Sequence, residues 1–233
     1  MRPSPRFDFM KTYLLLGILL VAATAPGQAE PETTAPVPTS AETELARTLR
    51  DIHILIAQKK YDEALTQIEP VIKANPSNPI AYSLRGGIYS EKELWADATK
   101  DFQKILILEP DNPSAKFNLA EVFFRQKKYD EARPGFDALT KNPVLGDLAT
   151  YKVFLCDLLG GHEEVAKKEW TALNDAGTNA SYYFGNVAWY LYHGQTADAR
   201  EWLASAARIY TSQKIVLYST SLMQLGYLPL PPL

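Results

Sequence analysis

A seven-residue segment occurs twice without change, and its spacing limits the folds open to this chain. The segment QKKYDEA occupies 58–64 and recurs at 126–132, so the two copies lie two periods of about 34 residues apart. A diverged copy, KELWADA, lies midway at 92–98, and the segments at 76–79 and 110–113 keep the same spacing. Periods of roughly 20–50 residues are typical of solenoids and related repeat arrays. We therefore expect a chain built from repeated structural units.

Each unit has the spacing of two amphipathic helices. Between Pro79 and Asn112, the residues Tyr82, Gly86 and Tyr89 fall at i, i+4 and i+7, on a single helical face. A helix pair alone leaves one apolar face uncovered, so successive pairs stack and share a continuous core. The second helix of this unit repeats the spacing with Ala98, Phe102 and Ile105.

These residues resemble the tetratricopeptide repeat family, in the form found in exported bacterial proteins. The unit of that family is a helix pair of about 34 residues. The resemblance implies an all-α fold, a right-handed α-solenoid of about five antiparallel helix pairs with a C-terminal capping helix. Matching positions in the flanking copies are Ala64, Ile68 and Pro76, and Leu119, Ala120, Phe123, Ala132 and Phe136.

The repeats do not match the pattern equally well. In the fourth, Val165 stands where the second helix is expected to carry a small residue, and whether this segment is a true repeat stays open. Pro70 is expected to kink its helix or end it early, whereas Pro134, beside Gly135, lies nearer a helix start and should cost less. Within a solenoid over 42–226, we expect repeats at about 45–78, 79–112, 113–145, 146–178 and 180–212, a cap at 213–226 and a tail at 227–233.

The N-terminal segment has the composition of a secretory signal. Basic residues precede an apolar run of about 13 residues, too short to cross a bilayer core, which takes ~20. We expect residues 1–29 to be removed, although a retained membrane anchor is the alternative. The Pro/Thr-rich stretch 30–41 is typical of a solvated linker. The predicted product is periplasmic or secreted and has no membrane span after signal removal.

The sequence offers no set of residues for catalysis or metal binding. His53, His162 and His193 lie far apart, and Cys156 stands among leucines in an apolar segment, as a buried thiol would. Without residues 1–29, which hold three of the 24 Lys+Arg and one of the 27 Asp+Glu, the net charge is −5 and evenly spread. This argues against nucleic acid or an anionic membrane surface as a partner, since both recruit clustered positive charge. We therefore expect no cofactor, no metal and no enzymatic activity. Asn179 begins a glycosylation-type triplet that is equally well explained as a helix cap.

The family resemblance also implies where a partner would bind. Ligands of that family usually lie in the concave groove lined by the first helix of each pair. Chaperone-binding members hold a terminal carboxylate with Lys and Asn on one repeat and Lys and Arg on another. Here the corresponding positions hold Leu49, His53, Ser114 and Asn118, so this clamp is absent. The implied groove residues are Leu49, His53, Ile56, Ser83, Ser90, Phe117, Glu121, Phe124, Phe184 and Leu191.

Two functions of different classes fit these observations. The favoured one is a non-enzymatic scaffold or adaptor of the cell envelope that binds a protein or peptide segment in the groove. The alternative is an exported module for a glycan or lipid, which would use the groove aromatics Phe117, Phe124 and Phe184.

Overall fold

The computed structural model describes residues 40–175, 177 and 179–228, and every regular element within these ranges is an α-helix. The expected signal at 1–29, nearly all of the linker and most of the tail lie outside the described residues. The helices are α1 (Ser40–Ala57), α2 (Tyr61–Ala74), α3 (Pro79–Glu91), α4 (Trp95–Leu108), α5 (Pro113–Arg125), α6 (Tyr129–Asp137), α7 (Gly146–Gly160), α8 (Glu163–Asp175), α9 (Ala180–Tyr192), α10 (Thr196–Ile209) and α11 (Ser212–Gln224).

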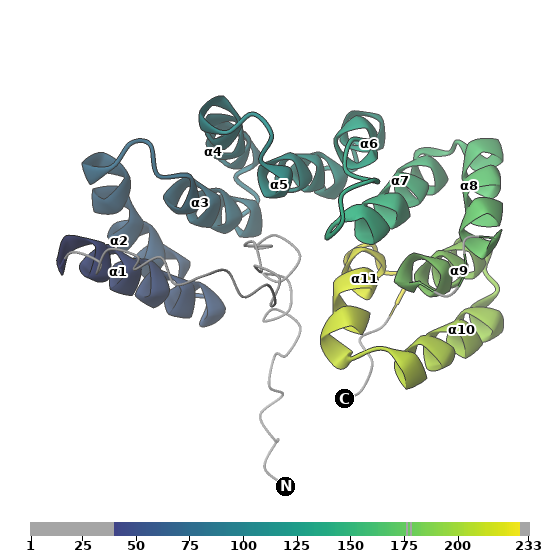
Figure 1. Ribbon diagram of the computed structural model, residues 1–233. Helices are drawn as coiled ribbons and strands as arrows, with labels where there is room; N and C mark the ends of the chain where they lie inside the picture. Colours follow the sequence, from purple (N-terminus) through teal and green to yellow (C-terminus); the bar gives the residue numbers. More distant parts are fainter. Residues whose placement is uncertain (1–39, 176, 178, 229–233) are drawn as a thin grey trace, which may run out of the picture.

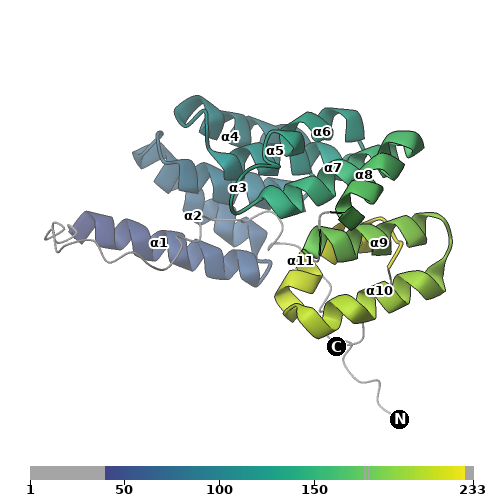
Figure 2. The same ribbon diagram turned by 45° about the vertical axis from the view of Figure 1, so that its right-hand side comes forward.

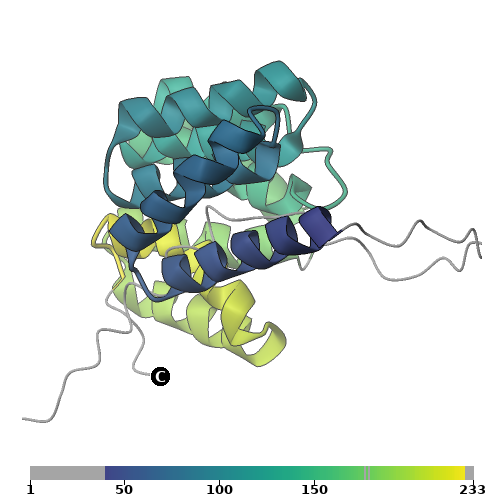
Figure 3. The same cartoon turned by 90° about the vertical axis from the view of Figure 1, so that its left-hand side faces the viewer.

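The helices form an arch in which each pair stacks on the next (Figure 1). The first helix of each pair lines the inner side of the arch, and α4, α6, α8 and α10 lie outside. Seen from the α1 end, the chain curves round, so that α10 and α11 lie below the middle helices of the arch, on the same side as α1 (Figure 3). The predicted all-α solenoid of five helix pairs followed by a further helix is confirmed.

An alanine column runs through the second helices of the first four pairs. Ala64, Ala98, Ala132 and Ala166 recur at the period of the repeat, and each is completely buried. A larger side chain would push the paired helices apart, because protein interiors are close-packed. The expectation that Val165 fills this position is wrong: Val165 is 43% exposed, and Ala166 takes the buried place. The register of the repeat therefore continues into the fourth pair.

The turn inside each pair has its own repeated conformation. Lys59, Glu93, Lys127, Gly161 and Gly194 all have positive φ, between 58° and 84°. The first four again follow the period of the repeat, and the last comes one position early. A side chain is strained in this left-handed region and glycine is not, so the first three turns keep a strain that the last two lack.

The two internal prolines act differently from what the sequence suggests. Helix α2 continues past Pro70 to Ala74, so the expectation of an early end is wrong there. Pro70 and Thr66, whose carbonyl loses its usual donor, are both exposed, so that carbonyl is open to water. Helix α6 instead ends at Asp137, less than a turn after Pro134. The following Gly135 permits close packing, because a Cβ there would lie 2.8 Å from Cβ of Ala120 on α5.

The strained turn gives a direct stability test. Replacing Lys127 with Gly relieves the positive φ of 61° and is expected to raise the free energy of unfolding by about 1 kcal/mol. Lys100→Gly, at an exposed position inside α4, should lower it by about 1 kcal/mol. Chemical denaturation of both variants measures the difference, and equal effects of the two substitutions would contradict the assignment of strain.

Candidate partner-binding groove

The inner side of the arch is partly filled by the chain's own last helix. Helix α11 turns back after α10 and lies inside the arch, against the inner helices, in both Figure 1 and Figure 2. Six of its residues, Val216, Tyr218, Ser219, Thr220, Ser221 and Leu222, are buried. The helix is therefore enclosed through its middle, and only its first turn and Gln224 are exposed.

One contact between α11 and the inner helices is an aromatic cluster. The Tyr218 ring stacks on Phe184 of α9, with centroids 5.2 Å apart, and lies 5.4 Å from the ring of Tyr151 on α7. Its hydroxyl donates a hydrogen bond to Oδ2 of Asp147 at 2.5 Å. Burial, followed by the adjacent Asp147 carboxylate, raises the pKa of Tyr218. The hydroxyl therefore stays protonated and acts as a donor.

The other contact is centred on a buried lysine. Nζ of Lys152 on α7 lies 2.6 Å from Oε2 of Glu121 on α5, and the two side chains are 5% and 7% exposed. The same nitrogen donates to Oγ of Ser221 at 2.6 Å and lies 4.4 Å from the centroid of the Phe124 ring. A buried charge requires such partners. Lys152 thus connects three helices at the base of the groove.

The expected groove residues divide into two sets. Leu49 and His53 on α1 and Ser83 on α3 are partly exposed, and partial burial lowers the pKa of His53. The other seven are buried because they pack against the next pair, the paired helix or α11, and as folded they offer no surface to a partner. This buried set consists of Ile56, Ser90, Phe117, Glu121, Phe124, Phe184 and Leu191.

The aromatics of the glycan or lipid alternative are core residues. Phe117, Phe124 and Phe184 are 1%, 2% and 0% exposed. Phe117 and Phe124 both pack edge-on against Phe136 of α6, and Phe184 stacks under Tyr218. These rings stabilise the fold and present no stacking face to a sugar or an acyl chain.

The sequence did not predict the central residues of the groove, Lys152, Asp147 and Tyr218. Lys152 stands in the apolar run YKVFLCDLL, whose only other charged residue is Asp157, and a charge in such a run requires a buried partner. This was the available signal. Asp147 and Tyr218 carried no local signal, because they are far apart along the chain. Asn179 does cap a helix: its side chain accepts a hydrogen bond from N of Tyr182 at 3.1 Å.

The titratable residues singled out in the sequence are engaged in structural contacts. Cys156 is 1% exposed, and burial raises the pKa of its thiol, which disfavours the reactive thiolate. His193 is hydrogen-bonded to Glu163, which raises the pKa of the histidine. Nδ1 of His162 lies 3.2 Å from Oδ1 of Asp157. Across the described part of the chain, no three His, Cys, Asp or Glu residues gather as metal ligands.

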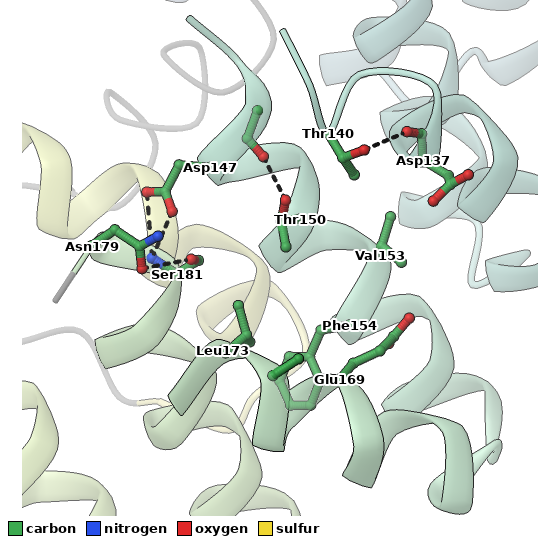
Figure 4. Close-up of a pocket in the computed structure, with 12 residues that line it drawn as sticks. Asp137, Thr140, Asp147, Thr150, Val153, Phe154, Glu169, Leu173, Asn179 and Ser181 are labelled. Carbon is green, nitrogen blue, oxygen red and sulfur yellow. Dashed lines mark hydrogen bonds between the residues drawn. The ribbon is translucent and has the colours of Figure 1, made fainter. Parts of the chain in front are cut away.

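A separate pocket of about 500 Å³ opens between α7, α8 and the start of α9 (Figure 4). Figure 4 shows Asp147 hydrogen-bonded to the backbone of Ser181 at one side, and Glu169 and Phe154 at the other. Burial, followed by the neighbouring Asp157 carboxylate, raises the pKa of Glu169 to about 7. Glu169 also accepts a hydrogen bond from Arg133 at 2.9 Å. Two of the three carboxylates of this pocket are thus already bound by protein groups.

None of the helices in the described ranges has both the length and the apolar character needed to span a bilayer.

The stacked helix pairs, the alanine column and the inner groove define an α-helical repeat protein. The tetratricopeptide repeat family model matches residues 52–106 and 89–143. The chain is a tetratricopeptide repeat protein. Proteins of this family generally mediate protein–protein interactions and are generally not enzymes.

Sequence similarity to characterised proteins is confined to part of the chain. Hsp70-Hsp90 organizing protein 1 of Glycine max is 33% identical over 78 residues, which is 34% of this chain and 14% of that protein. DnaJ homolog subfamily C member 3 of Rattus norvegicus is 34% identical over 89 residues, 36% of this chain and 18% of that protein. The chain therefore spans less than a fifth of either relative.

Similarity of fold extends much further. PilW, described as a widely conserved type IV pilus biogenesis factor, superimposes with a TM-score of 0.58 at 18% identity, covering 79% of this chain and 87% of PilW. PilF of Pseudomonas aeruginosa superimposes with a TM-score of 0.59 at 12% identity, covering 81% of this chain and 89% of PilF. At these identities the similarity establishes the fold alone.

The buried ion pair in the groove predicts a double-mutant result. Lys152→Met leaves the Glu121 carboxylate buried without its cation and should lower the free energy of unfolding by about 3–5 kcal/mol. Adding Glu121→Leu removes the uncompensated charge and should restore most of the loss, because an apolar pair of similar volume replaces the ions. Urea denaturation of the two single variants and the double variant measures the coupling. Additive losses would contradict a direct pair.

Proposed function

We propose that this protein is an exported, non-enzymatic adaptor that binds a segment of a partner protein in its concave groove. The family generally mediates protein–protein interactions, and the groove residues described above stabilise the fold without forming a catalytic set. Two observations support a role in the cell envelope. The structurally similar PilW is a pilus biogenesis factor, and residues 1–29 have the composition of a signal.

The observation that carries this proposal is the uneven covering of the groove. Helix α11 packs over the inner faces of α7 and α9 and reaches α5 through Leu217 and Thr220, which lie beside Phe117 and Glu121. On α1 and α3, the inner-face positions Leu49, His53 and Ser83 remain partly exposed. The covered half accommodates a helix, and the open half is where a partner segment first makes contact.

The absence of a carboxylate clamp limits the kinds of partner segment that the groove can bind. The clamp positions hold Leu49, His53, Ser114 and Asn118, so the groove has no cation pair there for a terminal carboxylate. The proposed ligand is consequently an internal, helical segment of a partner and not a free C-terminus. This distinguishes it from the ligand expected of clamp-bearing relatives.

Site-specific photocrosslinking tests the site. A benzoylphenylalanine placed at His53, on the inner face, should form an adduct with a defined partner in the native cell. The matched control places it at Ile107, which is 73% exposed on the outer helix α4. N-terminal sequencing of the purified protein tests export, and the mature chain is expected to begin at Glu30.

Each result has a clear meaning. A partner band from His53 and none from Ile107 supports binding in the groove. Equal adducts at both positions, or none at His53, would contradict it. A mature protein that still begins at Met1 and stays in the cytoplasm would contradict export.

A further inference from the structure

We propose that α11 is a releasable internal ligand of the groove, and that the partner is an amphipathic helix with the same chemistry, which replaces it. This rests on the proposed function and adds the identity of the recognised motif. The motif is a tyrosine that donates to Asp147, followed three residues later by a small hydroxyl residue that accepts from Lys152, as Tyr218 and Ser221 do.

The two residues that bind α11 through hydrogen bonds, Asp147 and Lys152, lie on one helix of the groove. Asp147 and Lys152 both belong to α7, and their partners Tyr218 and Ser221 are separated by one turn of α11. Residues at i and i+3 lie on one face of a helix. A second helix presenting the same pair makes both hydrogen bonds at once. Charged groups fix this register, because an incoming helix that lacks either group leaves Asp147 or Lys152 short of one partner.

The contact surface of α11 combines buried apolar residues, Val216, Tyr218 and Leu222, with a run of buried hydroxyl residues. The run Ser219-Thr220-Ser221 is buried, yet Oγ of Ser219 has no hydrogen-bond partner and Oγ1 of Thr220 donates to Val216 of its own helix. Small hydroxyl side chains at these three positions bury little apolar area. By comparison, the pair interfaces of the solenoid use alanine, phenylalanine and leucine. The hydroxyl run makes α11 less tightly packed than an all-apolar helix would be, and weaker packing is what an exchangeable helix requires.

The connection to α10 allows α11 to move as a unit. Only Tyr210 and Thr211 join the two helices, and both have extended backbone conformations, with ψ of 151° and 153°. In the proposed exchange, rotation about these two residues carries α11 out of the arch, and Tyr227 and Leu228, which pack against the same core cluster, leave with it. The Lys152–Glu121 ion pair stays in place after release and keeps the lysine neutralised.

Occupation by α11 lowers the apparent affinity of any competing helix. The measured dissociation constant equals the intrinsic one divided by the fraction of molecules in which α11 is released. A substitution that weakens the docking of α11 should therefore tighten binding of an external helix by the same factor. If α11 is a releasable ligand, the loss in its docking equals the gain in peptide affinity. If α11 is a purely structural helix, the two factors are unrelated.

The test uses the full mature chain and a labelled synthetic peptide of residues 210–228. Tyr218→Phe removes the hydroxyl that donates to Asp147, and one hydrogen bond to a charged group corresponds to about 10- to 100-fold in an equilibrium. Tyr151→Phe is the matched control, because its buried hydroxyl has no hydrogen-bond partner. Hydrogen exchange of α11 and the peptide dissociation constant are measured for each variant.

In Tyr218→Phe we expect α11 to exchange about 10- to 100-fold faster than in the unaltered chain, with α7 and α9 unchanged, and the peptide to bind tighter by the same factor. Tyr151→Phe should change neither value. Ser221→Ala, which removes the acceptor of Lys152, should act in the same direction as Tyr218→Phe.

Three results would overturn the inference: exchange of α11 only together with α7 and α9, a peptide affinity unaltered by Tyr218→Phe, or formation of a swapped dimer in place of peptide binding. If any of these occurs while His53 still crosslinks to a partner, the groove function stands and only the role of α11 is lost. Loss of the His53 adduct would instead remove the proposed function itself.

Discussion

The close approach of paired helices at one small residue governs the whole arch. Ala64, Ala98, Ala132 and Ala166 recur once per repeat with no exposed surface, and Ala199 follows one position early with 1% exposed. At each of these points the first helix of the pair packs on the second without a large side chain between them. The repetition of this small buried residue allows the same close packing in each pair, so that successive pairs stack in one array. The curvature, and with it the concave groove, results from this constraint.

The groove contains a buried ion pair. Lys152 and Glu121 form this pair at the base of the groove, and Asp147 lies near the start of the same helix α7. Replacing such a pair by apolar residues is often neutral or stabilising. The presence of the pair is therefore better explained by specificity in binding than by a contribution to stability. In the proposed exchange, this pair and Asp147 set the register of the bound helix, and α11 has the Tyr218 and Ser221 hydroxyls that match them.

The sequence predicted the repeat because repeats are local, whereas the groove depends on distant contacts. Periodicity, the Asn-Pro starts of α3 and α5 and the turn spacing all arise within a single repeat, so the solenoid followed directly from them. The alanine column was misplaced by one position at Val165, because no identical heptapeptide marks that pair. The helical periodicity of the first helices identified residues that face inward. Whether α11 covers them depends on contacts between residues far apart in the sequence, such as Lys152 with Ser221, and periodicity does not predict such contacts.

The central proposal is that one groove holds either α11 or a partner helix, and the position of α11 tests it most directly. Double electron–electron resonance measures that position as the distance between two spin labels, one at Arg50 on α1 and one at Gln224 on α11, both exposed. The labels are attached to cysteines introduced at these positions, and Cys156→Ser removes the native cysteine. One distance is expected in the free chain, and a second, broad population is expected when the 210–228 peptide is bound. A single unchanged distance at peptide saturation would contradict the exchange.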